Sequence, residues 1–207
     1  MTNPAPSLTI AALRIRFGDA ILRDRLSCGD SIVWVAAGRA HDILAWLRDD
    51  PGQGFDYLTD ITAVEYRDGE LPLEVVYQLR SLKRRADLRL KVELDQSAPL
   101  AVDSVCDLWT GANWLEREVF DMFGITFRNH PDLRRILMWE TYAEGHPLRK
   151  SFPLRGHFSR SEQTRQALAA NPEAHYSLEE LSIAEAYREL PVEMRERLGR
   201  GQRGEVA

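Results

Sequence analysis

The side chains that could do chemistry in this chain gather in its second half, where three carboxylates are followed by three histidines. Carboxylate oxygens bind hard cations, and paired carboxylates carry out general acid–base catalysis. However, no HExxH spacing joins the acids to a histidine, as a zinc hydrolase would require. We therefore expect a structural network of salt bridges, with no catalytic and no metal-binding residue. The six residues are Glu116, Glu118, Asp121, His130, His146 and His157.

The histidines and the basic loop also favour structural roles. His130 and His146 each precede a proline. Histidine titrates near neutral pH, but in such a setting a hydrogen bond to the backbone or to a partner carboxylate is more common than a pH sensor or a proton relay. The basic triplet Lys83–Arg85 is typical of a solvated loop. The glycines of Pro51–Gly54 follow a predicted helix, whereas a phosphate-binding loop follows a strand.

Composition excludes several functional classes. The 207 residues are 44% hydrophobic and 29% charged, with a net charge of -5. This balance argues against general nucleic-acid binding. Cys28 and Cys106 form no CxxC pair and cannot supply the four ligands of an iron–sulfur cluster, so reduced thiols are expected. The longest apolar run, Ile32–Ala37, is far shorter than the roughly 20 residues of a membrane-spanning helix. The N-terminus lacks the pattern of an export signal, so a cytoplasmic location is expected.

The first third of the chain alternates between helical and strand patterns. The apolar spacing that follows Ser7 predicts a helix with this serine as its N-cap. Ser31–Ala36 is a short β-branched and aromatic run typical of a buried strand. The spacing in Ala40–Leu47 predicts an amphipathic helix. Phe55–Tyr66 is typical of a further strand, which leads into a turn at Asp68-Gly69.

The clearest periodicity lies in two later segments. Leu73–Arg80 and Leu88–Asp95 alternate apolar and polar residues, as in an antiparallel sheet that is covered on one side. These patterns predict an α+β fold, a two-layer domain with a mostly antiparallel sheet and helices on one face. We expect this globular domain to occupy residues 1–125.

A helix predicted over Ala112–Phe123 contains the three carboxylates, and Gly124 follows it as a suitable C′ residue. An apolar stripe on one side of this helix faces the core. The remaining surface is crowded by charges, so that Glu116, Glu118 and Asp121 are expected at the surface with Arg117 among them.

Beyond this helix, regular patterns disappear. Three prolines interrupt the chain, and Arg128–Arg155 holds six Lys or Arg against three Asp or Glu. Ser177–Glu180 is a capping box that predicts a helix to about Leu190, with another short helix from Pro191. We expect residues 126–207 to form an extended, partly helical C-terminal arm that wraps a partner subunit.

Several blocks of this region resemble the 30-kilodalton subunit of respiratory complex I, which is the C subunit family of NADH–quinone oxidoreductase. The resemblance covers most of residues 30–155, and three blocks in the family's order and spacing are far more specific than one short motif. The first block is Glu116–Ile125, the second is His130–Arg135, and the third is Gly145–Lys150 with Phe152–Leu154. Asp56–Asp60 and Asp107–Trp109 are further family positions.

The resemblance implies a set of interface residues rather than an active site. Arg134, Arg135 and Arg149 are expected to make charge-assisted contacts with neighbouring carboxylates, so that their loss would lower the activity of the assembly more than the stability of the isolated domain. The full set is Glu116, Arg117, Glu118, Asp121, Phe123, Gly124, His130, Pro131, Asp132, Arg134, Arg135, Gly145, His146, Pro147, Leu148, Arg149, Lys150, Phe152 and Pro153.

The resemblance also implies a function: a non-catalytic assembly subunit in the peripheral arm of proton-translocating NADH:quinone oxidoreductase. Its arm would wrap the 49-kilodalton homologue, which is the D subunit, and brace the quinone site. NADH, FMN, iron–sulfur clusters and quinone would be bound by other subunits, and this chain would bind no cofactor of its own. It would lie on the cytoplasmic side of the inner cell membrane as a peripheral subunit, with no contact to nucleic acid.

Two alternatives remain open. The same scaffold could serve a related membrane-bound hydrogenase or a ferredoxin-fed complex, because the electron donor binds elsewhere. An independent carboxylate-dependent hydrolase would instead require a bound divalent metal. Two departures from the family affect the arm: residues 157–207 are helical in pattern where longer members are strand-like, and Ser151 replaces an expected acidic residue.

Overall fold

The computed structural model describes residues 5–66 and 72–170, with side chains described from Leu8 onward. Residues up to His157 form one compact unit, and a second unit begins at Phe158. The predicted turn at Asp68-Gly69 and the two predicted helices beyond residue 176 lie outside the described residues. Among the described residues, none of the helices has the length and apolar character needed to span a bilayer.

Thirteen elements follow one another along the described chain. They are α1 (Ala5–Phe17), a 3-10 turn (Gly18–Ala20), β1 (Ile21–Ser27), β2 (Asp30–Val35), a second 3-10 turn (Ala37–Arg39), α2 (Ala40–Asp49), β3 (Tyr57–Val64), β4 (Leu73–Ser81), β5 (Ala86–Leu94), β6 (Ala101–Asp103), α3 (Ala112–Phe123), β7 (Thr126–Arg128) and α4 (Arg160–Ala170).

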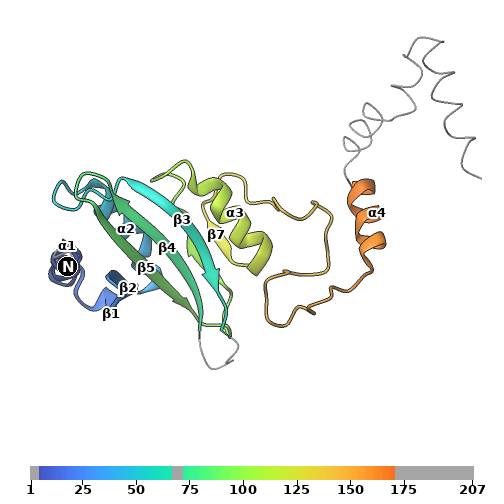
Figure 1. The fold of residues 1–207 in the computed structure, drawn as a ribbon, viewed down its shortest axis with the longest axis horizontal. Coiled ribbons are helices and arrows are strands. Elements are labelled where there is room, and N and C mark those ends of the chain that lie inside the picture. Colours follow the sequence, from blue (N-terminus) through green and yellow to red (C-terminus); the bar gives the residue numbers. More distant parts are fainter. Residues whose placement is uncertain (1–4, 67–71, 171–207) are drawn as a thin grey trace, which may run out of the picture. The chain divides into compact units, whose positions relative to one another are not determined.

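Five strands form the main sheet in the order β1-β2-β5-β4-β3 (Figure 1). The pairs β1–β2, β5–β4 and β4–β3 are antiparallel, whereas β2 and β5 run parallel. The prediction of a mostly antiparallel sheet is therefore confirmed. The parallel pair arises because the chain leaves β2, passes through α2, β3 and β4, and returns as β5 in the middle of the sheet.

The helices α1, α2 and α3 share one core with the sheet. Leu13 of α1, Leu44 of α2 and Val119 of α3 belong to a single buried cluster with Tyr77 and Leu90 of the central strands. Burying such side chains is the main driving force of folding, at about 25 cal/mol per Å² of apolar surface. The predicted two-layer α+β architecture is confirmed.

The opposite face of the sheet carries a buried polar cluster. Glu74 is 2% exposed, and its carboxylate accepts hydrogen bonds from Trp34 Nε1 at 2.7 Å, Lys91 Nζ at 2.7 Å and the Tyr66 hydroxyl at 2.6 Å. The burial of this carboxylate is possible because the partly buried ammonium group of Lys91 neutralises it and two neutral donors complete its hydrogen bonds.

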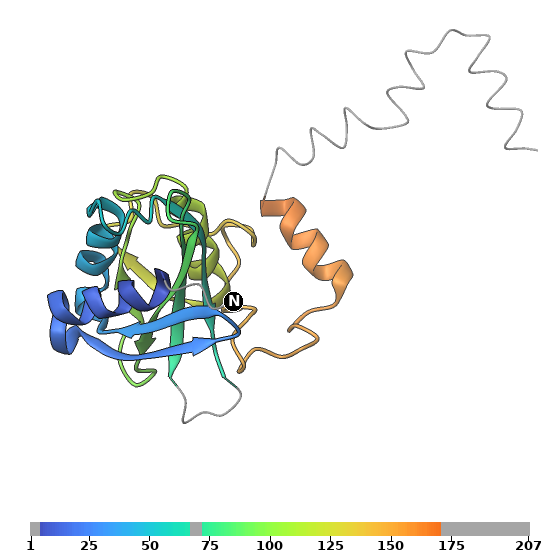
Figure 2. The ribbon, with the colours of Figure 1, turned by 60° about the vertical axis from the view of Figure 1, so that its left-hand side comes forward.

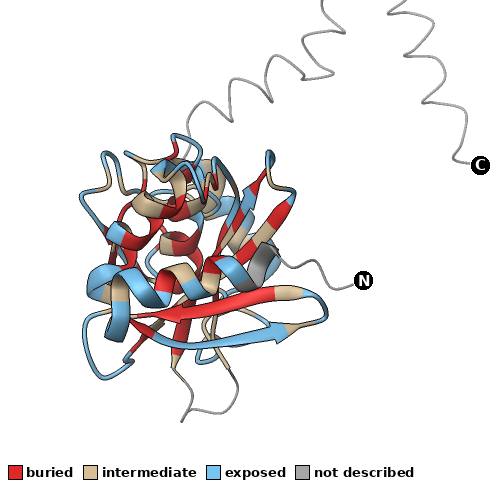
Figure 3. Ribbon diagram, turned by 90° about the vertical axis from the view of Figure 1, so that its left-hand side faces the viewer, coloured by how far each residue is buried: buried red, intermediate tan, exposed pale blue. Residues whose placement is uncertain are grey.

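Strand β1, at the edge of the sheet, was not predicted from the sequence. Most of its side chains are exposed, so it shows no alternation of apolar and polar residues, although β2 beside it is almost fully buried (Figure 3). Figure 2 shows α1 next to the hairpin of these two strands. The pairing of β6 with β7 was also missed, because such short strands carry too few residues for a periodic signal.

Two helix predictions need correction. Helix α1 already includes Ala5, so Ser7 lies inside the helix and is not its cap; Pro6 suits the first helical turn. Helix α4, in the second unit, lies within residues 157–207, whose pattern is helical, but its own bounds were not predicted. None of its residues is buried, so it lacks the apolar stripe on which such predictions depend. The Ser159 hydroxyl accepts a hydrogen bond from the Glu162 N–H at 3.3 Å and thus caps the start of this helix.

Candidate functional site

Helix α3 is the element on which the motif residues meet. Its predicted bounds are confirmed, and it ends at Gly124, which has φ +77° and donates its N–H to Phe120 O at 2.9 Å. Glu116, Arg117 and Asp121, predicted at the surface, are buried, which corrects that expectation; Glu118 is exposed. The periodicity of one helix could not show this, because the groups that pair with these charges come from other segments.

Glu116 connects α3 to the segment that precedes it. Its carboxylate, 0% exposed, accepts hydrogen bonds from Val105 N–H at 2.7 Å, the Ser104 hydroxyl at 2.7 Å and the Cys106 thiol at 3.5 Å. Burial raises the pKa of Glu116 above its ordinary value, although these donors act in the opposite direction. The carboxylate thereby fixes the turn that leads from β6 into α3.

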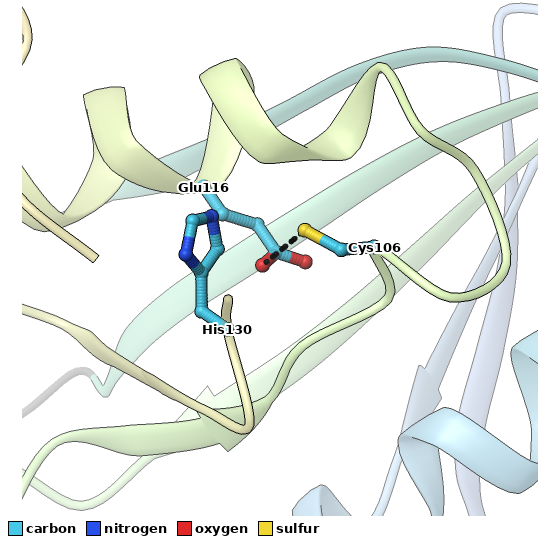
Figure 4. Close-up of side chains that lie close together, drawn as sticks. All are labelled: Cys106, Glu116 and His130. Atoms are coloured by element: carbon cyan, nitrogen blue, oxygen red, sulfur yellow. Dashed lines mark hydrogen bonds between the residues drawn. The ribbon is translucent and has the colours of Figure 1, made fainter. Parts of the chain in front are cut away.

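The side chains of Cys106, Glu116 and His130 form a compact cluster, drawn in Figure 4, whose ligand atoms lie within 4.8 Å of one another. His130 Nδ1 accepts the Asp132 N–H at 3.0 Å, so the proton resides on Nε2, which donates to Asn113 O at 3.1 Å. Burial raises the pKa of Cys106 to about 11, so its thiol stays protonated. A metal would need a free imidazole nitrogen and a thiolate, but both nitrogens of His130 already form hydrogen bonds and the Cys106 thiol is protonated. A hydrogen-bonded cluster therefore fits these residues better than a metal centre.

Asp121 holds the next motif block against the helix. Its Oδ2 accepts three consecutive backbone N–H groups, from Ile136 at 3.1 Å and from Leu137 and Met138 at 2.8 Å each. Its Oδ1 accepts Arg135 Nη1 at 2.5 Å. Burial alone would raise the pKa of Asp121, but the four donors outweigh it and the pKa lies below its ordinary value.

Two arginines complete this attachment through backbone carbonyls. Arg117, which is 7% exposed, donates from Nε to Arg134 O at 3.2 Å and from Nη2 to Arg135 O at 3.1 Å. Arg135 in turn donates from Nη2 to Gly145 O at 3.1 Å. One guanidinium from the helix and one from the following segment therefore hold residues 134–145 in place.

The third motif block covers the C-terminal end of α3. His146 Nδ1 donates to Asp121 O at 2.9 Å, and Leu148 N–H donates to Met122 O at 3.0 Å. The ring of His146 lies so close to Gly124 that a Cβ at this position would be 2.6 Å from ring atoms Cδ2 and Nε2. A residue without a side chain is thus required here for two reasons, its left-handed φ and the neighbouring imidazole.

Arg149 and Lys150 reach back to the sheet domain. Arg149 Nη2 lies 3.4 Å from Glu65 Oε1 and donates to Gln96 Oε1 at 3.1 Å. The Lys150 N–H donates to Glu65 Oε2 at 2.7 Å. Glu65 was not predicted as part of this site, because no local pattern near the end of β3 links it to a segment so much later in the chain.

The carboxylates that pair with the three predicted arginines belong to this chain. Arg135 pairs with Asp121, Arg149 with Glu65, and Arg134 with Asp132 at 2.8 Å in an exposed pair. We therefore revise the expected order of effects for Arg135: its loss should destabilise the chain itself.

The rest of the predicted interface set divides by exposure. Phe123 lies in the core, and the Phe152 ring is 5.1 Å from that of His157. The half-buried members cluster around the two ends of α3, and they are Gly124, His130, Arg135, Gly145, His146, Pro147, Arg149 and Phe152. The exposed members are Glu118, Pro131, Asp132, Arg134, Leu148, Lys150 and Pro153.

The pKa shift of Asp121 predicts a pH dependence of folding. Because its folded-state pKa lies below the unfolded value of about 3.9, its contribution to stability is present above that pH and is lost as the pH falls through the folded-state pKa. The unfolding free energy of Asp121→Asn should therefore fall less steeply than that of the wild-type chain between about pH 5 and pH 2. Denaturant titrations at each pH measure this slope, and equal slopes would contradict the assignment.

A fold of this kind occurs in a respiratory membrane complex. A chain of the archaeal membrane-bound sulfane sulfur reductase superimposes on this one with a TM-score of 0.50. That similarity covers 77% of this chain and 89% of the other at 20% sequence identity, so it shows the fold alone.

Sequence comparison gives the family. Residues 33–158 match the family described as the respiratory-chain NADH dehydrogenase 30-kilodalton subunit, and the chain belongs to this family. It is 48% identical over 142 residues to the C subunit of NADH-quinone oxidoreductase from Roseiflexus sp. (strain RS-1), covering 69% of this chain and 80% of the relative. It is 43% identical over 152 residues to the C 2 subunit from Rhizobium etli (strain CIAT 652), covering 73% and 80%. The family predicted from the motif blocks is confirmed.

Proposed function

We propose that this chain is a structural subunit of a proton-translocating NADH:quinone oxidoreductase and has no active site of its own. Electrons from NADH would pass through FMN and iron–sulfur clusters in other subunits to quinone. The observation that carries the proposal is that the charged motif side chains bond within this chain. They form hydrogen bonds and an ion pair that hold the chain's own segments to α3, and they are Glu116, Arg117, Asp121 and Arg135. Groups engaged in this way fit a scaffold and not a catalytic site.

The same geometry supports the absence of a cofactor in this chain. The carboxylate–histidine–thiol cluster is satisfied by hydrogen bonds, and the raised pKa of Cys106 disfavours the thiolate that metals and clusters need. Metal analysis and an absorbance spectrum of the purified chain test this point. A stoichiometric metal, a flavin or a cluster would contradict it.

The partner surface that we propose lies on the outer side of the attached segment. We call this the arm surface, and it consists of Leu137, Leu148, Lys150, Leu154 and Arg155. These side chains are exposed, with Leu137 at 60%, Leu148 at 50% and Leu154 fully so. Exposed leucines beside exposed basic groups suit an interface with an acidic rim on the other subunit. We assign the 49-kilodalton homologue, the D subunit, as that partner, with the complex on the cytoplasmic side of the membrane.

Charge reversal on the arm surface tests the proposal. Lys150→Glu combined with Arg155→Glu should weaken association with the assembly by about tenfold or more, because like charges would then face each other across the contact. The measurement is co-purification of the tagged chain with quinone reductase activity from native membranes at increasing salt. Deleting residues 126–207 would be a poorer test, since it would also remove the core residue Phe127 and the segment that covers Asp121.

The matched control for this experiment is Lys83→Glu, a charge reversal of an exposed lysine in the loop between β4 and β5. This control should assemble normally. If the double variant assembles as well as the control does, the proposed arm surface is wrong.

The alternative assembly, a hydrogenase or a ferredoxin-fed complex, is the weaker candidate. The chain is 43–48% identical to subunits named for NADH–quinone oxidoreductase but only 20% identical to the chain of the sulfane sulfur reductase complex. An FMN-binding NADH dehydrogenase subunit in the isolated assembly would support the leading proposal. Its replacement by a hydrogenase subunit would support the alternative.

A further inference from the structure

A hollow of about 350 Å³ lies at the C-terminal end of α3, between the sheet domain and the segment attached to it. Its lining combines the apolar side chains of Leu100 and Phe123 with polar and aromatic side chains of the third motif block and its surroundings. These include Glu144, His146, Phe152 and His157. A volume of this order is at the lower end of the range for binding pockets.

Two side chains that line this hollow, Glu144 and Arg149, have buried polar atoms with no hydrogen-bond partner in the described part of the chain. Both carboxylate oxygens of Glu144 are buried and accept no hydrogen bond from any residue that the structure describes. Arg149 Nη1 is buried and equally without an acceptor among the described residues. The charge of Arg149 is already balanced by Glu65, so the carboxylate of Glu144 remains the uncompensated charge. A buried charge in this state is costly, and another group must compensate it.

His146, which also lines the hollow, carries a second acceptor. His146 Nδ1 must carry a proton, because its partner, the Asp121 carbonyl oxygen, can only accept a hydrogen bond. In the neutral ring, His146 Nε2 is therefore an acceptor, and no described residue is seen to donate to it. Together with Glu144 it makes this a site for a ligand rich in hydrogen-bond donors.

We propose that the hollow binds an arginine side chain of a partner subunit, an inference that rests on the proposed role of this chain as a scaffold. The planar guanidinium matches the two free oxygens of a carboxylate with a fork of donors, which a lysine ammonium or a metal ion does not. The rings of Phe152 and His157, 5.1 Å apart at 89°, offer a face on which a guanidinium stacks, and Leu100 and Phe123 receive the methylene groups.

Two details of the site follow from this assignment. Because the oxygens of Glu144 are covered in the chain by itself, binding includes a rotation of this side chain into the hollow that it lines. Arg149 Nη1 then bonds to an acceptor of the inserted segment, such as a main-chain carbonyl. The site thus binds a cation, although the exposed charges of the surrounding segment are mainly basic. It differs in this from the arm surface, which is proposed to face acidic groups of the partner.

Glu144→Gln tests the inference in the assembled complex, since it removes the charge and keeps the shape. With the full-length tagged chain in native membranes, we expect its retention at rising salt to weaken by about 30-fold or more, the loss that follows from leaving the arginine buried and unpaired. The control is Glu140→Gln, an exposed glutamate in the same segment. It should behave like the wild-type chain, and equal retention of the two variants would overturn the inference.

Two further measurements separate a partner site from an internal role of Glu144. The purified full-length Glu144→Gln chain should unfold at the same denaturant concentration as the wild-type chain or a higher one, because an unpaired buried charge has been removed. A loss of stability as large as the loss of association would assign Glu144 an internal role and overturn the proposal. In a structure of the complex, a guanidinium should lie within hydrogen-bond distance of Glu144; water or one of this chain's own groups there would also overturn it.

The outcomes distinguish this inference from the proposed function. If reversal of Lys150 and Arg155 weakens assembly but Glu144→Gln does not, the arginine site is wrong and the scaffold role stands. If none of these variants affects assembly, both the arginine site and the proposed function are wrong.

Discussion

Arg135→Ala is expected to destabilise the isolated chain by about 3–5 kcal/mol, the usual cost of removing one partner of a buried ion pair. The Asp121 side chain is 0% exposed, and the Arg135 side chain that neutralises it is 14% exposed. Without the guanidinium, the carboxylate would keep three backbone donors but no counter-charge, and Gly145 O would lose its donor as well. Two motif blocks would thus loosen from α3 at once. Equilibrium unfolding in denaturant measures the change.

The matched control is Arg134→Ala in the adjacent position. Arg134 pairs with Asp132, but both side chains are 58% exposed. This pair should therefore contribute only about 0–1 kcal/mol. A comparable loss in the two variants would mean that the attachment of the segment to α3 does not depend on the buried pair. An assembly defect without a stability defect in Arg135→Ala would instead support the expectation from sequence, in which this arginine contacts a partner subunit.

Gly124→Ala should have the second large effect. The backbone at this position is left-handed, with φ +77°, and the added Cβ would lie 2.6 Å from the ring of His146. Such a conformation costs a residue with a side chain about 1–3 kcal/mol. The ring cannot retreat without breaking its bond to Asp121 O. We therefore expect both a lower unfolding free energy and weaker association, because the same ring borders the proposed arginine site.

The control for this substitution is Gly111→Ala at the other end of the same helix. Gly111 has φ -64°, and a Cβ there would meet no atom within 4 Å. Its replacement should change stability by less than about 1 kcal/mol. If both variants unfold alike, the close approach of His146 to Gly124 has no energetic importance.

Local pattern accounts for the parts of the fold that were predicted correctly. Strand β5 has alternating side chains because one of its faces lies on the core, and α2 and α3 show an apolar stripe for the same reason. Strand β1 shows no such pattern, since most of its side chains are exposed. Helix α4 shows none either, because none of its residues is buried. A pattern of hydrophobicity predicts elements that pack one face against a core, and it does not reveal elements that bury few side chains.

The burial of the charged residues of α3 could not be predicted from such a pattern. A carboxylate in a helix is expected to be exposed, because burying it without partners would be prohibitive. Asp121 is nevertheless buried, since three successive N–H groups and Arg135 come to it from a segment without regular structure. No spacing within the sequence connects these groups.

The class of fold, the bounds of α3 and the family could be predicted from the sequence, because each of these depends on residues close together in the chain or on the order of its motif blocks. The folded chain was needed to show that the charges of Glu116, Arg117 and Asp121 face inward and that Glu144 borders a hollow with no partner among the described residues. Those facts depend on which distant backbone groups can satisfy a buried charge, and that is a property of the packed chain.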